Sequence, residues 1–172
     1  MSSVKAPSRG SRLPDRRLLS TTVVDKVIVV KSAEELTDSF RSQGLRVTPQ
    51  RQAIFRLLQG NAEHPTVESL YDAARVAMPT ISLKTVYQTV HDLEAMGEVT
   101  VLEVGTGSVR VDPNVEDAHQ HLICTECGKV RDVLVDVGSL ALSNREGRGF
   151  TVADVEVNFR GVCDDCAGAK RS

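Results

Sequence analysis

Between residues 33 and 97 the apolar positions recur with the spacing of amphipathic helices, and each expected helix carries a start or stop signal. The four expected helices are Ala33–Gln43 ended by Gly44, one starting at Thr48–Pro49, one capped by Thr66, and one from Ser82 to Met96 ended by Gly97. The apolar positions expected to face inward are Leu36, Phe40, Ile54, Leu57, Leu58, Val67, Leu70, Tyr71, Ala74, Val86, Val90 and Leu93.

After residue 97 the pattern changes from a helical period to alternation. The β-rich runs Glu98–Val104 and Ser108–Val111 flank a Gly105–Gly107 turn, so a hairpin is expected directly after the fourth helix. A hairpin in this position is typical of a winged helix–turn–helix, whose last helix enters the DNA major groove. Further strands are expected over His119–Cys124, Lys129–Val135 and Thr151–Phe159, with a helix near Asp136–Glu146.

These elements predict an α+β chain, with an N-terminal winged-helix DNA-binding domain followed by a small α/β dimerisation domain with an antiparallel sheet. The start of the chain differs: Pro7, Gly10 and Pro14 interrupt any helix, and Val23–Val30 suits a short strand or a docking segment. The expected organisation is a flexible extension over 1–35, the DNA-binding domain over 36–112, a hinge over 113–118, the dimerisation and metal-binding domain over 119–167, and a tail over 168–172.

Composition limits the function classes. Hydrophobic residues make up 41% of the 172 residues but aromatic residues only 3%, so the core must be aliphatic. The net charge of −2 means that any affinity for DNA has to come from a local surface. No stretch reaches the roughly 20 apolar residues of a membrane span, and no signal peptide is recognised, so a cytoplasmic protein is expected.

The four cysteines fall in two pairs, Cys124 with Cys127 and Cys163 with Cys166. The two-residue gap lets both sulfurs of one turn face one ion, and Gly128 supplies the permissive backbone of a metal knuckle. Two such turns complete a tetrahedral four-thiolate zinc site, which has no vacant position and is therefore structural. Redox-active dithiols or thiols without a partner are the alternative; zinc is favoured because both pairs are used.

Three histidines and two aspartates form a second candidate site. His119 and His121 alternate along an expected strand, so their rings face the same side. Asp112 ends the hairpin, Asp132 lies on the neighbouring strand, and His64 precedes the third helix. This mixture of imidazoles and carboxylates suits Fe²⁺ or Mn²⁺ and would also accept Zn²⁺.

The place of this second set in the chain connects it to regulation. His64 belongs to the helical half and the other four residues to the hinge and the second half, so one shared ion would fix the halves relative to each other. In a dimer this would set the spacing of the recognition helices, which must match half-sites about 34–36 Å apart or a multiple of that. From spacing alone two alternatives stay open: His64 as a surface or packing residue, and Asp112 as part of a turn with Pro113 and Asn114.

From about residue 36 to 167 the chain resembles the ferric uptake regulator (Fur) superfamily. The matching segments, in order, are Gly44–Arg51, His64–Thr66, Ser82–Leu93, Gly97–Glu98, His119–Gly128 and Gly161–Cys166. Within the superfamily it is most similar to the peroxide-sensing branch, of the PerR and catalase-repressor type. Iron-sensing members usually have Glu where Asp132 stands and a longer His-rich run than His119–His121, and zinc-uptake sensors usually add a thiolate to the regulatory site.

The resemblance implies two metals. It implies a structural Zn²⁺ on Cys124, Cys127, Cys163 and Cys166, and a regulatory Fe²⁺ or Mn²⁺ on His64, Asp112, His119, His121 and Asp132. Peroxide is then expected to oxidise His64 or His119 through bound iron, so that the metal and afterwards the DNA are released. With Mn²⁺ the same protein is expected to bind DNA but to react poorly.

The resemblance further implies a homodimeric transcriptional repressor that binds a palindromic operator in double-stranded DNA. Thr85, Tyr87 and Gln88 are expected to contact bases, and Lys84, Arg46 and Arg51 to contact phosphates. Gln88 departs from the Arg or Asn that many relatives carry after the tyrosine.

Three other functions compete with this interpretation. A metal hydrolase using His119, His121 and an aspartate is disfavoured because no general base with a supporting motif such as His-Glu-x-x-His is present. A zinc-ribbon interaction module that never touches DNA is the second. Within the preferred class, an iron-responsive repressor of metal-uptake genes is the runner-up.

Overall fold

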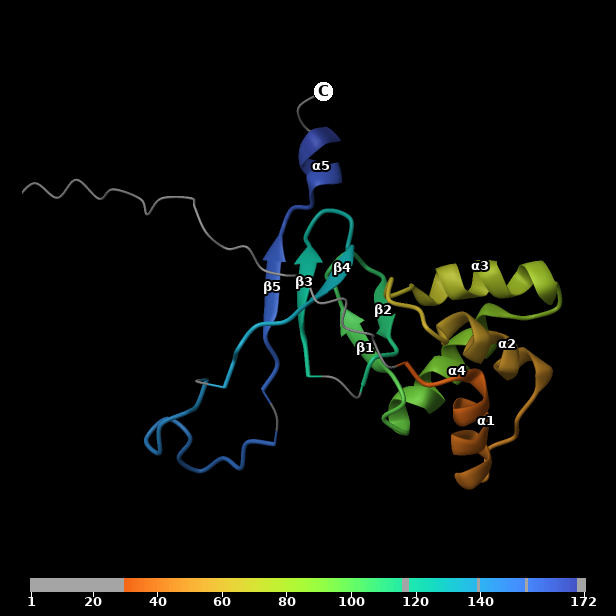
Figure 1. Cartoon of the computed structure of the whole chain (residues 1–172), viewed down its shortest axis with the longest axis horizontal. Coiled ribbons are helices and arrows are strands. Elements are labelled where there is room, and N and C mark those ends of the chain that lie inside the picture. The colour runs from red at the N-terminus through yellow and green to blue at the C-terminus, as the bar shows by residue number, and fades with distance from the viewer. Residues whose placement is uncertain (1–29, 116–117, 139, 154, 170–172) are drawn as a thin grey trace, which may run out of the picture.

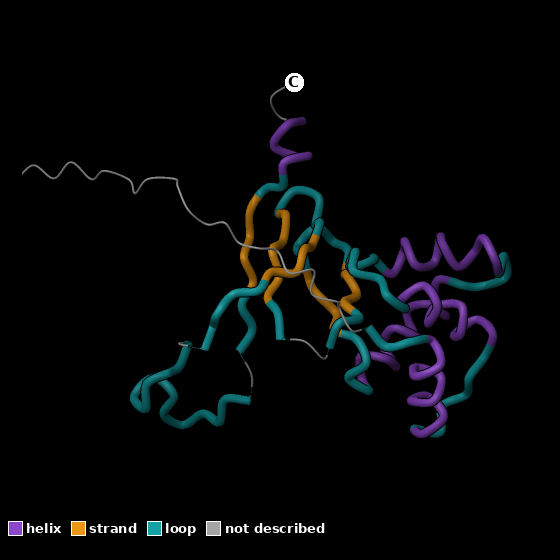
Figure 2. The backbone as a smooth tube through the Cα atoms, in the orientation of Figure 1, coloured by secondary structure: helices purple, strands orange, loops and turns teal. Residues whose placement is uncertain are grey.

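The computed structural model describes residues 30–115, 118–138, 140–153 and 155–169. Four helices gather on one side of the molecule, a three-stranded sheet lies on the other, and a two-stranded hairpin lies between them (Figure 1). Figure 2 shows helix concentrated in the first half and strands in the second. The expected extension up to residue 29, with nearly all of Val23–Val30, lies outside the described residues, as do residues 116–117 of the expected hinge and 170–172 of the expected tail.

The four helices are α1 (Ala33–Ser42), α2 (Pro49–Leu58), α3 (Val67–Ala77) and α4 (Leu83–Ala95). Thr48, Thr66 and Ser82 each accept a hydrogen bond from the backbone N–H three residues ahead, which confirms the predicted caps. A reciprocal capping box between Ser32 and Glu35 starts α1. None of the described helices is long and apolar enough to cross a membrane.

The helices enclose an aliphatic core that also takes in Val99 and Val111 from the hairpin region. The inward-facing positions predicted from the sequence are buried, with two exceptions. Leu57 and Tyr71 are only half-buried at the edge of the core. Phe55 occupies the buried position on α2 instead, with its ring 4.9 Å from that of Phe40.

The hairpin predicted after the last helix is present as β1 (Thr100–Glu103) and β2 (Val109–Asp112), an antiparallel pair. Its turn uses Gly105 and Gly107 at φ of +82° and +86°, a region that favours glycine. The register places Asp112 opposite Thr100. This hairpin follows α4 as the wing of a winged helix, and we call residues 100–112 the wing.

The three-stranded sheet has the order β4–β3–β5, with β3 (Gln120–Cys124) at its centre. β4 (Val130–Val133) runs antiparallel to β3, as predicted, but β5 (Asn158–Gly161) runs parallel to it, so the sheet is mixed. A short helix, α5 (Asp164–Ala169), follows β5 at the end of the sheet (Figure 1).

Two expectations in this half were wrong. The strand expected over Thr151–Phe159 is reduced to β5, and the described residues among 136–153 form turns and loop rather than a helix near Asp136–Glu146. Their apolar side chains, Leu142 and Phe150 among them, stay exposed, Phe150 by 81%. An apolar period stabilises a helix or strand only where a surface buries it, and the described part of the chain offers none here.

Candidate metal centres

The structure brings the four cysteines together beside the end of the sheet. Their sulfurs all lie within 4.8 Å of one another, and Cys127 Sγ is 3.8 Å from Cys163 Sγ. A zinc ion about 2.3 Å from each of four tetrahedral sulfurs would separate them by about 3.8 Å. All four cysteines are free thiols, so the cluster fits a closed four-thiolate metal site.

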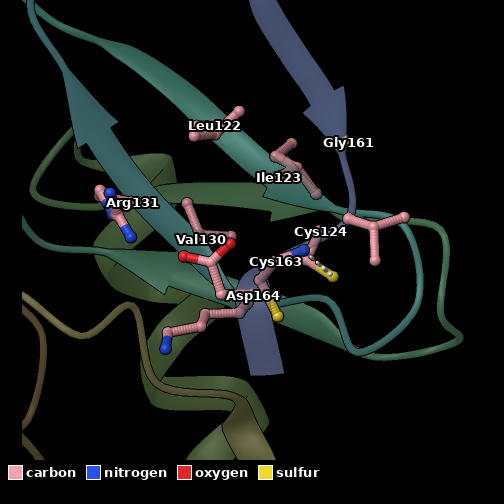
Figure 3. Close-up of a pocket in the computed structure, with 10 residues that line it drawn as sticks. Leu122, Ile123, Cys124, Val130, Arg131, Gly161, Cys163 and Asp164 are labelled. Atoms are coloured by element: carbon pink, nitrogen blue, oxygen red, sulfur yellow. Dashed lines mark hydrogen bonds between the residues drawn. The ribbon is translucent and has the colours of Figure 1, made fainter. Parts of the chain in front are cut away.

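Local backbone geometry builds this thiol site from two distant segments. Gly128, at φ +68°, closes the first turn by donating its N–H to the carbonyl of Cys124 at 2.9 Å. The parallel pairing of β3 with β5 sets Cys124 opposite Gly161, which delivers Cys163 two residues later. Figure 3 shows Cys124 and Cys163 side by side, where the Cys163 N–H donates to Cys124 Sγ at 3.3 Å.

The electrostatic environment differs from one sulfur of the thiol site to the next. Backbone N–H groups of Cys127 and Cys163 lower the pKa of Cys124 to about 6. Hydrogen bonds to the sulfurs of Cys163 and Cys127 raise the pKa of Cys166 to about 12. One sulfur is thus readily ionised while another is held as a thiol, and a bound cation is what allows all four to ionise together.

The five residues of the second candidate site also converge, although they come from four separate segments. The atoms of His64, Asp112, His119 and His121 that could bind a metal lie within 4.8 Å of one another. The Nε2–oxygen distances are 3.0 Å from His119 to Asp112, 3.2 Å from His121 to Asp112, 2.8 Å from His64 to Asp132, and 3.7 and 3.8 Å from His119 and His121 to Asp132. Adjacent ligands about 2.1 Å from one ion lie about 3 Å apart, so this spacing suits a single ion.

Burial separates this cluster from an ordinary set of polar side chains. His64 is 1% exposed, and neither of its ring nitrogens makes a hydrogen bond within the described residues. Asp132 Oδ1, which faces the same point, is also buried without a hydrogen bond. Buried polar atoms that make no hydrogen bond are costly, and a cation between the His64 ring and Asp132 Oδ1 would satisfy both, so these residues fit a metal.

Hydrogen bonds from the wing to the backbone of the helical half hold His64 at the site. Arg110 donates from Nη1 to the carbonyl of His64 at 3.0 Å, and the Val111 N–H donates to the carbonyl of Pro65 at 2.9 Å. The loop before α3 is therefore bonded to β2, the strand that ends at Asp112. On the sheet, the antiparallel register sets His121 directly opposite Asp132.

Asp112 is held ionised at the centre of the cluster. Burial alone would raise the pKa of Asp112. Hydrogen bonds from His121 and from the N–H of Asn114, with the other imidazoles close by, more than offset burial, so the pKa of this carboxyl lies below its usual value. The Asn114 bond, at 2.8 Å, is also the turn foreseen around Pro113, so Asp112 makes the turn and faces the site at once.

Asn114 also supports His119, a role that was not predicted from the sequence. Its side-chain amide lies 3.4 Å from Nδ1 of His119, on the ring edge away from the site. A cavity of about 560 Å³ opens beside it and is lined in part by Asp112, His119 and His121. Small molecules can therefore reach this side of the cluster, whereas His64 is sealed.

A separate hollow lies between the N-terminal ends of α2 and α4. Five of the residues expected to contact DNA line it: Arg46, Arg51, Lys84, Thr85 and Gln88. Tyr87 is 44% exposed on the same helix, but its hydroxyl donates to Glu68 of α3 at 2.6 Å. The hollow joins two helix N-termini with basic side chains, an arrangement that suits phosphate.

Arg51 lies differently from the expectation of a phosphate contact. Its guanidinium donates to Asp92 of α4 and to the carbonyl of Arg46, and it packs over the ring of Phe40 at 5.0 Å. Asp92 also accepts from the amide of Gln88 at 2.7 Å. The side chain of Arg51 thus links α2 to α4, and Arg46 and Lys84 are the exposed basic groups here.

Comparisons with known proteins agree with this architecture. Residues 42–160 match the model of the ferric uptake regulator family. A peroxide-responsive repressor, PerR, of Staphylococcus epidermidis is 37% identical over 137 residues, which cover 77% of this chain and 89% of that protein. The PerR of Staphylococcus aureus strain Mu50 is 36% identical over 137 residues, covering 77% and 90%.

Solved structures with the same fold include a zinc-bound manganese uptake regulator, which is 33% identical with a TM-score of 0.58 and covers 77% of this chain and 99% of its own. The ferric uptake regulator of Helicobacter pylori, described with three functional metal-binding sites, has a TM-score of 0.65 over 80% of this chain and 95% of its own. At 20% identity it shows the fold alone. With its family match covering most of the sequence, the chain belongs to the ferric uptake regulator family.

Proposed function

We propose that this protein is a metal-dependent, DNA-binding transcriptional repressor that responds to peroxide. The observation that carries the proposal is the convergence of His64 from the helical half, Asp112 from the wing and three side chains of the sheet half on one point. An ion bound there joins the DNA-reading half to the sheet half. The 37% identity to a peroxide-responsive repressor supports this type of signal.

Two metals have separate roles in this proposal. The four thiols, Cys124, Cys127, Cys163 and Cys166, would hold a structural Zn²⁺ that fastens β5 and α5 to the turn after β3. The three imidazoles and two carboxylates would hold Fe²⁺ or Mn²⁺, for which nitrogen and oxygen ligands are better suited than a thiolate set.

The DNA surface would be α4 with the hollow beside it. Thr85 and Gln88 lie where they can contact bases, Arg46 and Lys84 where they can contact phosphates, and Tyr87 where its ring can touch a base edge. Arg51 would position α4 against α2. A DNA regulator of this kind acts in the cytoplasm and is not an enzyme; the relatives at 36–37% identity are named as repressors.

A homodimer on a palindromic operator follows from the sheet half. Its exposed large apolar side chains, which the described residues leave uncovered, are Leu122, Leu134, Val135, Leu140, Leu142, Phe150, Val152, Val155, Phe159 and Val162. Monomeric proteins rarely expose so many together, and a second copy would cover them. Two copies then present two α4 helices to successive major grooves.

Peroxide would reach the His/Asp centre through the cavity beside Asp112, His119 and His121. Fe²⁺ held by these five ligands would supply the one-electron redox chemistry that generates an oxidant from peroxide beside the ligand rings. His119 would lie next to the cavity and His64 on the closed side; oxidation of either ring removes a ligand. The two halves then separate, and DNA is released.

The test compares the iron and manganese forms of the zinc-loaded dimer on a palindromic duplex selected from a random library. Peroxide is expected to release DNA from the iron form and to add the mass of one oxygen atom to a peptide containing His64 or His119. The manganese form is expected to stay bound. Oxidation confined to cysteine peptides, with zinc loss, would contradict the proposal and indicate thiol sensing.

An iron-responsive or manganese-responsive repressor of metal-uptake genes is the second candidate. It is supported by the shared family and by the 33% identity to a manganese uptake regulator of the same fold. Peroxide at saturating free metal separates the two: a peroxide sensor in its iron form releases DNA with an oxidised ligand histidine, whereas an uptake regulator stays bound and releases DNA only as the free metal falls through its working range.

A further inference from the structure

The wing lies along one face of the three-stranded sheet, and the His/Asp centre is only one end of that contact. Cross-strand partners project to the same face. The register pairs His121 with Asp132 and Ile123 with Val130, so the two candidate ligands are followed, two residues along each strand, by an apolar pair. The face therefore continues from the metal centre towards the thiol site.

Apolar contact fills the middle of this interface. Leu102 and Val104 of the wing form a buried cluster with Ile123 and Val130 of the sheet. Figure 3 shows Ile123 and Val130 side by side on neighbouring strands, next to the Cys124 end of the sheet. This cluster is separate from the core of the helical half, and its burial requires the wing to lie on the sheet.

The far end of the interface is closely fitted. A Cβ atom added to Gly128 would lie 2.8 Å from Thr106 Oγ1 and 3.0 Å from Val104 Cγ2. The turn of the wing thus rests directly on the knuckle between Cys127 and the following strand, with no room for a larger residue. The thiol site and the wing are in contact, although they are separated in sequence.

Arg160 fastens the edge of the wing to the sheet. The parallel register sets Arg160 opposite Ile123, so it belongs to the same face. Its guanidinium donates from Nη1 to the carbonyl of Val104 at 3.3 Å and from Nη2 to the carbonyl of Glu103 at 3.4 Å. Two bonds from one planar fork fix the direction of β1 as well as its distance, which a single ammonium group cannot do.

We infer that Arg160 is a positioning residue for the His/Asp metal centre. It holds β1 on the sheet, and β2, paired with β1 in fixed register, thereby brings Asp112 to His121. Arg160 contacts no metal ligand itself. The inference rests on the metal centre of the proposed function, but it depends on neither DNA binding nor peroxide sensing.

The physical basis is linkage between docking of the wing and binding of the ion. An ion that needs both Asp112 and the sheet ligands binds only when the wing is docked, so anything that favours docking raises its affinity. The reverse also holds: the ion strengthens the docking of the wing. Removing the two Arg160 bonds therefore weakens metal binding from a distance.

The test measures Mn²⁺ affinity by calorimetry on the zinc-loaded full-length protein without DNA. R160Q is expected to bind Mn²⁺ about three- to tenfold more weakly than the wild type, as expected for two modest hydrogen bonds. R160K keeps the charge without the fork and is expected to lie between the two. R131Q is the matched control, because Arg131 is exposed and pairs with Leu122 on the opposite face, and it is expected to bind as the wild type does.

Amide hydrogen exchange over residues 102–106 gives a second readout in the metal-free, zinc-loaded protein. Exchange is expected to be faster in R160Q than in the wild type or R131Q. Equal Mn²⁺ affinity and equal exchange in R160Q and the wild type, both with full zinc content, would overturn the inference. If R160Q loses zinc, the same comparison is made between R160K and the wild type. A wild type that binds Mn²⁺ but no DNA contradicts the proposed function and leaves the role of Arg160 standing, whereas a wild type that binds no Mn²⁺ overturns both.

Discussion

His64 combines two unfavourable features that a shared function explains. It is the single described non-glycine residue with a positive φ, 47°, and its ring is buried without a hydrogen bond. A non-glycine residue in this region costs about 1 kcal/mol or more and persists only where the surroundings enforce it. Here Arg110 and the Val111 N–H enforce it, and the ring is thereby aimed at Asp132.

Replacing His64 with Asn tests its role as a ligand without adding backbone strain, because Asn tolerates the left-handed region. We expect H64N to lose more than about 100-fold in Mn²⁺ affinity, since even supporting residues of metal sites are worth about 10–100-fold. Zinc content is expected to stay at one ion per chain. H91N, at an exposed histidine of α4, is the control, and Mn²⁺ binding by H64N at wild-type strength would exclude His64 as a ligand.

The Tyr87–Glu68 hydrogen bond makes a pH-dependent contribution to stability. The bond from Tyr87 lowers the pKa of Glu68, so the stabilisation is complete above the ordinary pKa of 4.5 and is lost as the pH falls through the lower folded value. Y87F should therefore lower the free energy of unfolding by about 0.5–1 kcal/mol at pH 7. Denaturant unfolding at several pH values checks this; the gap between wild type and Y87F should narrow below pH 4.5, and a gap unchanged with pH would contradict it.

At the scale of elements, local signals were sufficient where the chain makes its own contacts. The caps Thr48, Thr66 and Ser82 and the glycines of the wing turn predicted the helices and the hairpin, because these signals act within a few residues. The segment around Leu142 and Phe150 was predicted wrongly, because its apolar side chains pack against no surface among the residues that the structure describes. The parallel direction of β5 depends on contacts distant in sequence, which no local pattern records.

The candidate ligands could also be identified from the sequence, because Cys, His and Asp are residue types whose side chains bind metal ions. Supporting residues were not. Nothing in the sequence separates Arg160, which donates to the wing, from Arg131, which lies on the opposite face of the sheet. Arg51 was expected at phosphates because it is basic and near α4, and only its partner Asp92 indicates a positioning role.

Gly128 lies where the turn after β3 packs against the wing, and adding a single methyl group there would disrupt this contact. G128A is expected to destabilise the protein by about 1 kcal/mol through φ alone, and further through the clash with Thr106 and Val104. G44A is the matched control, since Gly44 has φ +70° but no atom within 4 Å of an added Cβ. Thermal unfolding of the zinc-loaded proteins should place G128A below G44A; equal losses would show that the close approach has no energetic weight.

At the scale of the whole molecule, losing one metal centre should have different consequences from losing the other. The thiol site joins β3 to β5 and α5, so its loss removes a fastening of the sheet half, whereas the His/Asp centre joins the helical half, which keeps its own core, to the sheet. C163S is expected to lose zinc and the dimer, while D132N keeps both and loses Mn²⁺. Sedimentation and metal analysis check this, and a stable C163S dimer without zinc would contradict the structural role of the thiol site.

The central claim is that one ion at the His/Asp centre decides whether the paired α4 helices can bind DNA. It is tested most directly by the anisotropy of a labelled, library-selected palindromic duplex, titrated with zinc-loaded protein at stepped free Mn²⁺. The account predicts that operator affinity rises as one further ion per chain binds, and that D132N shows no rise. Operator affinity that is the same with excess chelator as with saturating Mn²⁺ would contradict it.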